Sequence, residues 1–274
     1  MSNEQNNFGT VVSLFRYPVK SMIGEELNAT VVTQRGLVGD RAYALIDSDT
    51  GKVVSAKNPK KWGKLFSFRS AFTESPVQGE AIPPVRITLP DGDIVTTQQS
   101  NFNQIISDVL EREVTLGTVS PETPSLEEYW PDMDGLVNRD ITTDESMPAN
   151  TFFDFAVVHL LTTATIDHLR QLYPQGRFEV RRFRPNIVVK PLTDEKEFLE
   201  NNWVGHTLAI GNEVRLNIIG KCPRCVMTTL AQGDLPKDMG TLKTAAKYNE
   251  ANIGVYASVL QGGTIHRDDP IRLE

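Results

Sequence analysis

The stretch TLAIGNEVRLNII, residues 207–219, decides the fold class that we expect for this chain. It contains two short apolar runs, Thr207–Ile210 and Val214–Ile219, and the turn residues Gly211 and Asn212 separate them. Short runs rich in Ile, Val and Leu between turn residues are typical of β-strands. The stretch therefore predicts two strands and a turn.

The same pattern recurs along the whole chain. Further strands are expected at Gly9–Phe15, Asn28–Thr33, Arg41–Ile46, Phe66–Phe72, Val85–Leu89, Ile94–Thr97, Val114–Val119, Phe152–Val158, Asn186–Val189 and Ile253–Leu260. The turn residues of Asp47–Gly51 predict a hairpin between two strand-like runs. Short strands at such even spacing favour β-barrel-like units over a doubly wound parallel sheet.

Three helices are expected among these strands, so the fold class is mixed α/β but rich in β-structure. One starts near Ser100 and runs for roughly a dozen residues, with its apolar side chains on one face. A second is capped by Thr162 or Thr163, and a third covers Thr241–Tyr248.

Composition excludes several classes of protein. The 274 residues carry a formal net charge of −7, which argues against general nucleic-acid binding. No apolar run reaches the ~18 residues of a membrane span, and residues 1–7 read as neither a secretory signal nor a transit peptide. We therefore expect a cytoplasmic protein with no membrane partner.

The two cysteines, Cys222 and Cys225, are the chain's only thiols. Two thiols exclude a disulfide framework and a four-cysteine iron–sulfur cluster on this chain. The Cys-x-x-Cys spacing leaves a zinc site, a redox dithiol, a lone metal thiolate and a pair of buried structural thiols open. The strand-like residues Val226–Leu230 argue against the dithiol, and Lys221 and Arg224 favour an ionised sulfur that binds a soft metal.

Cations gather in four short segments of this acidic chain. The segments are Arg16–Ser21, Gly39–Arg41, Arg181–Asn186 and Lys221–Arg224. Guanidinium and ammonium groups beside hydroxyls are what an anionic, phosphate-bearing ligand requires, although any single arginine is more simply a solvated surface charge. No glycine-rich nucleotide motif is present, and His159 lies in an apolar run typical of a core histidine.

These segments together resemble a known family. Tyr17-Pro-Val-Lys20-Ser21 and Gly36-Leu-Val-Gly-Asp40-Arg41 are similar to the N-terminal β-barrel domain that precedes many MOSC domains. The MOSC domain itself is resembled by segments starting at Phe183, Trp203, Cys222 and Ile253, namely FRPNIVV, WVGHTLAIG, CPRCVMTT and IGVY. This domain is shared by the C-terminal part of molybdenum cofactor sulfurase and by the mitochondrial amidoxime-reducing component, and the resemblance runs from about Phe8 to Leu273.

The resemblance implies a MOSC N-terminal β-barrel domain at residues 8–119, a proline-rich connector at 120–150, and a MOSC β-barrel domain at 151–273. It also implies a molybdenum–molybdopterin cofactor with Cys225 as metal ligand and catalytic thiolate. The family's cofactor-binding positions correspond to Lys20, Ser21, Arg41, Arg184, Asn186, Arg224 and Tyr256. The sequence departs from the family at Pro223, where relatives often have Ser, and at Asp154-Phe-Ala156, where relatives offer hydroxyls.

The activity that the resemblance implies is reduction of small N-hydroxylated compounds. The electrons would come from a separate donor protein, ferredoxin- or cytochrome-like, and its reductase. The alternative is a module that carries sulfur or molybdenum cofactor without substrate turnover, with a persulfide on Cys225.

Overall fold

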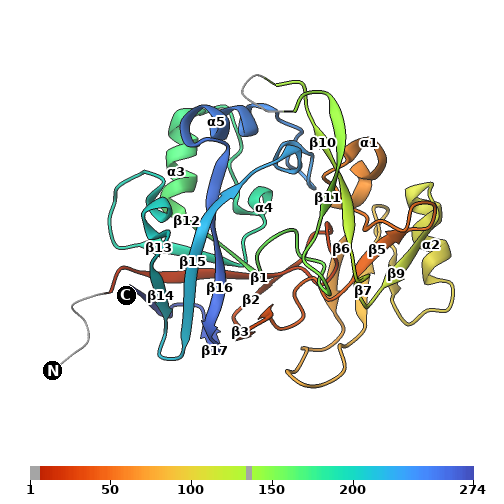
Figure 1. The fold of residues 1–274 in the computed structure, drawn as a ribbon, viewed down its shortest axis with the longest axis horizontal. Helices are drawn as coiled ribbons and strands as arrows, with labels where there is room; N and C mark the ends of the chain where they lie inside the picture. The colour runs from red at the N-terminus through yellow and green to blue at the C-terminus, as the bar shows by residue number, and fades with distance from the viewer. Residues whose placement is uncertain (1–6, 134–137) are drawn as a thin grey trace.

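The computed structural model describes residues 7–133 and 138–274 and contains a closed β-barrel at its centre (Figure 1). In spatial order its strands are β13 (Ile187–Pro191), β12 (Val158–Thr162), β16 (Asn252–Gln261), β15 (Val214–Pro223), β14 (Thr207–Ile210), β18 (Pro270–Leu273) and β1 (Gly9–Arg16). Because β1 also pairs with β13, the sheet closes on itself as a seven-stranded barrel, and β2 (Glu25–Leu27) extends it beyond β1. The expected β-rich fold with a β-barrel is confirmed.

The barrel interior explains why these runs form strands. Alternate residues of β1 and β15, such as Val11, Val214, Leu216 and Ile218, are buried in one apolar core that also contains Trp203. Strand residues alternate between the two faces of a sheet, so one apolar side chain in two is enough to fill a barrel. The stretch 207–219 supplies β14 and the first part of β15, as predicted.

Short helices cover the barrel on one side. They are α3 (Thr163–Leu172), α4 (Val180–Phe183), α5 (Gly240–Asn249), and the 3₁₀ segments η3 (Leu199–Trp203) and η4 (Val226–Thr229). Figure 1 shows α3 and α5 side by side at one end of β16. Thr162 caps α3 by accepting a hydrogen bond from the Thr165 amide at 3.1 Å, which confirms the predicted cap.

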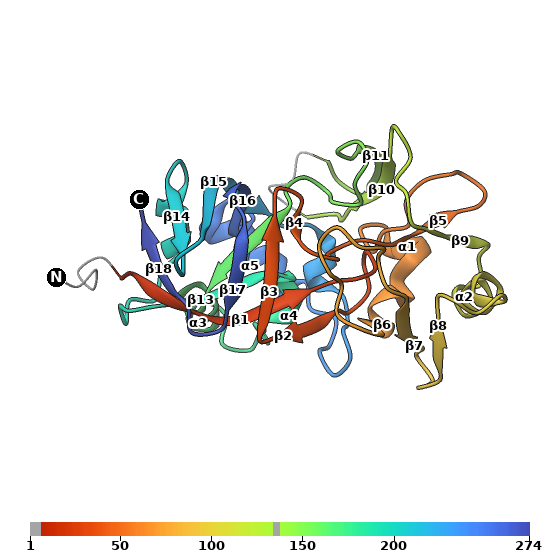
Figure 2. The same ribbon diagram turned by 90° about the horizontal axis from the view of Figure 1, so that it is seen from below.

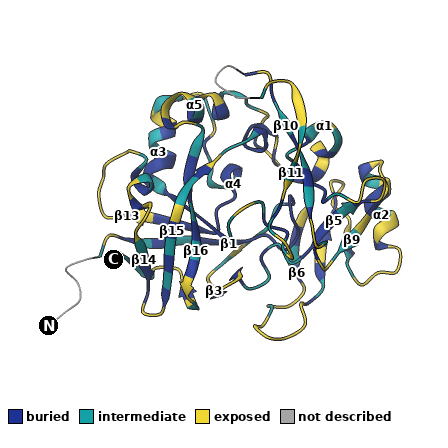
Figure 3. Cartoon of the chain, in the orientation of Figure 1, coloured by how far each residue is buried: buried dark blue, intermediate teal, exposed yellow. Residues whose placement is uncertain are grey.

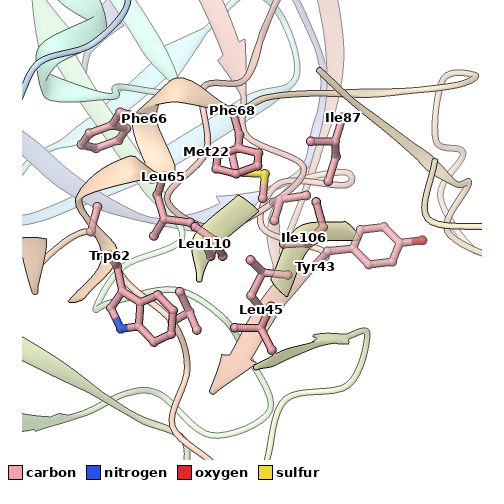
Figure 4. Close-up of a cluster of buried hydrophobic side chains, with 14 of the residues drawn as sticks. Met22, Tyr43, Leu45, Trp62, Leu65, Phe66, Phe68, Ile87, Ile106 and Leu110 are labelled. Atoms are coloured by element: carbon pink, nitrogen blue, oxygen red, sulfur yellow. The ribbon is translucent and has the colours of Figure 1, made fainter. Parts of the chain in front are cut away.

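A second apolar core lies on the other side of the molecule, where it is covered by a two-stranded sheet, a three-stranded sheet and a group of short helices (Figures 1 and 2). The elements are β5 (Ala44–Asp47) with β9 (Val114–Gly117), the sheet β6 (Arg69–Phe72), β7 (Val85–Thr88) and β8 (Ile94–Thr96), and α1 (Pro59–Trp62), η2 (Gly63–Ser67) and α2 (Phe102–Leu110). Their side chains converge in Figure 4, where Phe68, Met22 and Ile87 lie together. A third small sheet pairs β17 (Gly263–His266) with β3 (Ala29–Thr33) and β4 (Gly36–Leu37).

The segment expected to be a connector forms a β-hairpin. Its strands β10 (Ser125–Trp130) and β11 (Ile141–Ser146) pair antiparallel, from Ser125 opposite Ser146 to Trp130 opposite Ile141. Figure 3 shows that this hairpin carries more exposed residues than the barrel strands do. The domain boundaries stay a prediction, although β1 itself lies in the sheet of the barrel.

Three local expectations were wrong. Residues 152–157 lie outside any strand, and β12 starts only at Val158. Residues 63–67 form η2 before β6 starts, and Val226–Thr229 form η4 instead of continuing the strand. Most of the apolar side chains in these places are buried, although Phe155 is exposed, but a short apolar run does not by itself distinguish a strand from a tight turn or an irregular segment. Within the described residues no helix is both long enough and apolar enough to cross a membrane.

Candidate functional site

A cavity of about 620 Å³ opens between the barrel and the β10–β11 hairpin. Most of its lining comes from the hairpin, the loop before β12, the segment after α4, and the end of β15 with the start of η4. Arg41, Lys57, Ala251 and Tyr256 complete the lining. Its charged and aromatic lining residues are Arg41, Lys57, Glu128, Trp130, Glu145, Phe153, Asp154, Phe155, His159, Phe183, Arg184, Lys221, Arg224 and Tyr256, together with Asn186 and Cys225.

Cys225 lies half-buried in the cavity wall, at the residue that precedes η4. Its carbonyl accepts a hydrogen bond from the Thr228 side chain at 3.0 Å, which fixes the turn that presents the sulfur. Burial and the nearby Glu128 carboxylate raise the pKa of this thiol to about 11. In the protein alone Cys225 is therefore a neutral thiol, and a bound metal cation is what would ionise it.

Cys222 has the opposite character. It is fully buried on β15 and does not line the cavity. The Arg224 guanidinium donates to its sulfur at 2.8 Å. Although burial alone raises the pKa of this thiol, Arg224 and His159 lower it to about 6. The expected ionised sulfur is thus Cys222, to which Arg224 donates, whereas Lys221 pairs with Glu250 at 3.3 Å. Arg224 also lowers the pKa of Cys225, but burial and Glu128 outweigh it.

Arg184 is a buried cation in the cavity wall without an ion pair among the described residues. It occupies the left-handed region at the end of α4, with φ at 54°. Its guanidinium donates to the Met22 carbonyl at 2.6 Å and lies 4.1 Å from the centre of the Tyr17 ring. Burial lowers its pKa to about 10. A buried cation with one neutral acceptor favours an anion in the cavity.

Arg41 and Arg224 complete the cationic wall. Arg41 pairs with Asp40 and lies over the rings of Tyr17 and Phe153, at 4.8 Å and 5.6 Å. The Nε of Arg224 is buried and has no hydrogen-bond partner among the residues that the structure describes. A buried donor without a partner is costly, so a ligand that accepts from it would be bound favourably.

Lys57 and Asp154 are site residues that the sequence interpretation missed or set aside. The ammonium of Lys57 lies 2.9 Å from Glu128 and 3.7 Å from Asp154, and Asp154 also pairs with Lys20. Despite its burial, these two lysines hold the pKa of Asp154 well below its usual range. Asp154 was noticed only as a departure from the family, and nothing in the local sequence marks Lys57 among its neighbours Lys60 and Lys61.

Six of the eight residues expected at the site line the cavity: Arg41, Arg184, Asn186, Arg224, Cys225 and Tyr256. Lys20 and Ser21 do not. Lys20 is buried against the Phe152 carbonyl and Asp154, and the Ser21 hydroxyl accepts from the Ala56 amide at 3.1 Å.

The Asn186 side chain is already used within the protein. It accepts from the His159 amide at 3.1 Å and donates to Asp40 at 2.9 Å. Within the described residues no three His, Cys, Asp or Glu side chains are placed together to hold a metal ion. A metal here would depend on the Cys225 thiolate and on ligands that the protein does not supply.

Two family models match the chain. Residues 8–105 match the MOSC N-terminal β-barrel domain, and residues 148–272 match the MOSC domain. Mitochondrial amidoxime reducing component 2 of Rattus norvegicus is 25% identical over 289 residues, which cover 96% of this chain and 82% of that protein. The molybdenum cofactor sulfurase of Oryza sativa subsp. japonica is 25% identical over 86% of this chain but only 30% of its own length. A solved structure of the YuaD protein from Bacillus subtilis covers 98% of this chain at 10% identity with a TM-score of 0.49.

Proposed function

Because the chain belongs to the family that joins an N-terminal MOSC β-barrel domain to a MOSC domain, we propose that it binds a molybdenum–molybdopterin cofactor and reduces N-hydroxylated compounds. The observation that carries the proposal is the setting of Cys225. A thiol lies in the wall of a cavity that five cations also line, in a chain whose net charge is −7. The relative from rat, whose name gives it a role in reducing amidoximes, aligns with 96% of this chain.

The residues present fit an anionic cofactor that brings a soft metal. Cys225 would supply the thiolate. Arg184, with no ion pair among the described residues, and the unpartnered Nε of Arg224 would bind the anionic groups, and Arg41 lies on the same wall. Tyr256 lines the cavity beside them. Lys20 and Ser21 would act from behind the wall, by holding Asp154 and the backbone at Ala56, and Asn186, which lines the cavity, would hold Asp40.

When bound, the cofactor supplies two-electron chemistry at molybdenum. Conversion of an N–OH group to N–H consumes two electrons and two protons and releases water. The electrons must come from outside, since the chain's two cysteines are too few for a cluster. We therefore propose a separate ferredoxin- or cytochrome-like donor with its reductase. Although burial alone lowers the pKa of Lys57, the charges of Asp154, Cys225 and Glu128 raise it far above its usual range, so Lys57 is a fixed positive charge beside Cys225.

Metal analysis of the purified protein tests this proposal. The protein made in a host that synthesises molybdopterin should contain molybdenum and the fluorescent pterin, and it should reduce benzamidoxime with an artificial electron donor. Cys225→Ser should abolish the activity and most of the molybdenum, whereas Cys222→Ser should retain molybdenum, because only Cys225 lines the cavity. A protein without molybdenum, or equal sensitivity to the two substitutions, would refute the proposal.

The alternative is carriage of sulfur or cofactor without turnover, and the match to the rice sulfurase over 86% of this chain favours it as the second candidate. Here Cys225 would carry a persulfide. Mass spectrometry of the intact protein distinguishes the two functions. A labile added sulfur that Cys225→Ser removes supports carriage, and a bound metallated pterin supports the enzyme.

A further inference from the structure

The two faces of the β10–β11 hairpin have different surroundings: one lines the cavity and the other contacts lysines of the protein body. Because residues paired across an antiparallel hairpin point to the same side, Glu128, Trp130, Thr143 and Glu145 share one face. Glu128, Trp130 and Glu145 line the cavity. The opposite face, which includes Glu127 and Asp144, turns away from the cavity.

Lysines hold the outer face against the body of the protein. Lys61 pairs with Glu127 at 2.8 Å and Lys52 with Asp144 at 2.6 Å. Lys60 pairs with Asp140 at 3.3 Å and lies 4.0 Å from the centre of the Tyr129 ring, at the far end of the hairpin. A network of several charges positions a hairpin better than one surface pair does. The inner face is therefore presented to the cavity in a defined position.

On the inner face, one hydroxyl joins an indole to a carboxylate. The Trp130 Nε1 donates to the Thr143 hydroxyl at 2.8 Å, and that hydroxyl donates to Glu145 at 2.7 Å. Both end residues are half-exposed, so a molecule that enters the cavity can reach them. Glu128 and Asp154 are neutralised by lysines, but Glu145 has no ion pair among the residues described.

The hairpin also lies outside both family matches, which cover residues 8–105 and 148–272. The residues that match the family models thus line the cavity on the side of Cys225, and the hairpin closes it from the other side. A segment of this kind is suited to select substrates, because it changes the cavity wall without changing the barrel.

We propose that Trp130, Thr143 and Glu145 form a substrate-selecting wall that favours cationic substrates bearing a planar, delocalised C–N group. A carboxylate without a cationic partner binds an amidinium or guanidinium through charge-assisted hydrogen bonds, and the indole face attracts the same cation. The inference rests on the proposed function, because an amidinium is the product of amidoxime reduction. In this arrangement the inner face of the hairpin selects the substrate, and the reaction takes place at the opposite wall, where Cys225 lies.

Binding of benzamidinium to the protein tests the wall without any need for turnover. Trp62 and Trp203 are buried, so Trp130 is the tryptophan whose fluorescence a cavity ligand can quench directly. In the cofactor-loaded protein, where the anionic cofactor occupies the cations of the opposite wall, benzamidinium should bind more tightly than benzoate, and Glu145→Gln should weaken benzamidinium binding about tenfold. Trp130→Leu, measured by calorimetry, should weaken it as well. The matched control is Glu122→Gln, which removes an exposed carboxylate near the start of the hairpin that does not line the cavity, and it should leave the affinity unchanged.

Kinetics of the holoprotein supply the second arm. Three benzamidoximes with a cationic, a neutral or an anionic para substituent should be reduced with kcat/KM falling in that order. Glu145→Gln should reduce the preference for the cation about tenfold through KM, with the neutral substrate unaffected. Equal benzamidinium affinity in wild type and Glu145→Gln, or a preference for benzoate, would overturn the inference. Failure to reduce all three compounds would instead refute the proposed reaction, and the binding arm would still decide the role of the wall.

Discussion

Replacement of Lys57 by methionine is the sharpest test of how the site is held together. Lys57 lies 2.9 Å from Glu128 and 3.7 Å from Asp154, and the side chains of Lys57 and Glu128 are 17% and 9% exposed. Methionine keeps the length of the side chain and removes the charge. Asp154 keeps its second partner, Lys20, but Glu128 is left as a buried carboxylate without a cation.

The cost follows from the burial of the pair. Removal of one partner from a buried ion pair costs about 3–5 kcal/mol. Because Lys57 retains some exposure and Asp154 stays paired, we expect the lower end, about 3 kcal/mol in the free energy of unfolding. For a chain of this size, that loss lowers Tm by roughly 6–10 °C. Thermal unfolding followed by circular dichroism measures the shift.

Two further variants make the result decisive. Lys64→Met removes a lysine that pairs with Glu111 at 2.5 Å on the surface, where the side chains are 52% and 78% exposed, and it should cost less than about 0.5 kcal/mol. The double variant Lys57→Met with Glu128→Gln removes the stranded charge and should recover much of the loss. If Lys57→Met is no worse than Lys64→Met, or if the double variant is simply additive, the reasoning is wrong.

Three other changes test separate parts of the fold and the site. Gly254→Ala should lower Tm strongly, because Gly254 has φ at +79° and an added Cβ would lie 2.3 Å from the His159 ring. The smallest loss that we expect in the free energy of unfolding is about 1 kcal/mol. A Tm within 2 °C of the wild-type value would contradict this prediction. Burial raises the pKa of Glu200 in the folded protein above its unfolded value near 4.5. The protonated side chain therefore contributes its full share to the free energy of unfolding below pH 4.5, and this contribution is lost as pH rises through the folded pKa. Glu200→Gln should therefore gain stability relative to wild type as pH rises above 4.5, and urea unfolding at a series of pH values that shows parallel curves would refute the assignment. Thr143→Val removes both side-chain hydrogen bonds that link Trp130 to the carboxylate, and it should broaden substrate choice without loss of molybdenum, as metal analysis and kcat/KM ratios would show.

The strands of the barrel were predictable because their pattern is local. Val214–Ile219 and Ile253–Leu260 alternate or concentrate apolar residues between turn residues, and both lie in barrel strands. Strand order was not predictable. The pairing of β1 with β13 joins segments that only the folded chain brings together, and no local pattern contains that information.

The hairpin was missed because its strands have few apolar residues. Of β10 and β11, only Leu126 lies in an apolar core, and the other inward side chains face the cavity. Its outer face depends on ion pairs with lysines of residues 52–61, which lie far away in sequence. The sequence of a strand that is stabilised by ion pairs with distant residues has the polar composition of a loop, so the pattern did not predict these strands.

The site was predictable as a set of residue types but not as a set of contacts. Three of the four basic segments do meet at one cavity, and Lys20 of the remaining segment reaches it only through Asp154. The direction of the Arg224 side chain could not be read from its place between two cysteines. It contacts Cys222 rather than Cys225, and Cys222 therefore has the lower pKa of the two thiols.

The pairing of β1 with both β13 and β18 also has a consequence during synthesis. Gly9 lies opposite Pro191 on one side and Ile271 on the other, so the strand that closes the barrel leaves the ribosome long before either neighbour exists. Contacts so distant in sequence form late, since the loops between them must first be closed. The barrel can be completed only after the last of its strands has emerged, and until then the first residues of β1, which β2 does not cover, form an exposed strand edge open to other nascent chains.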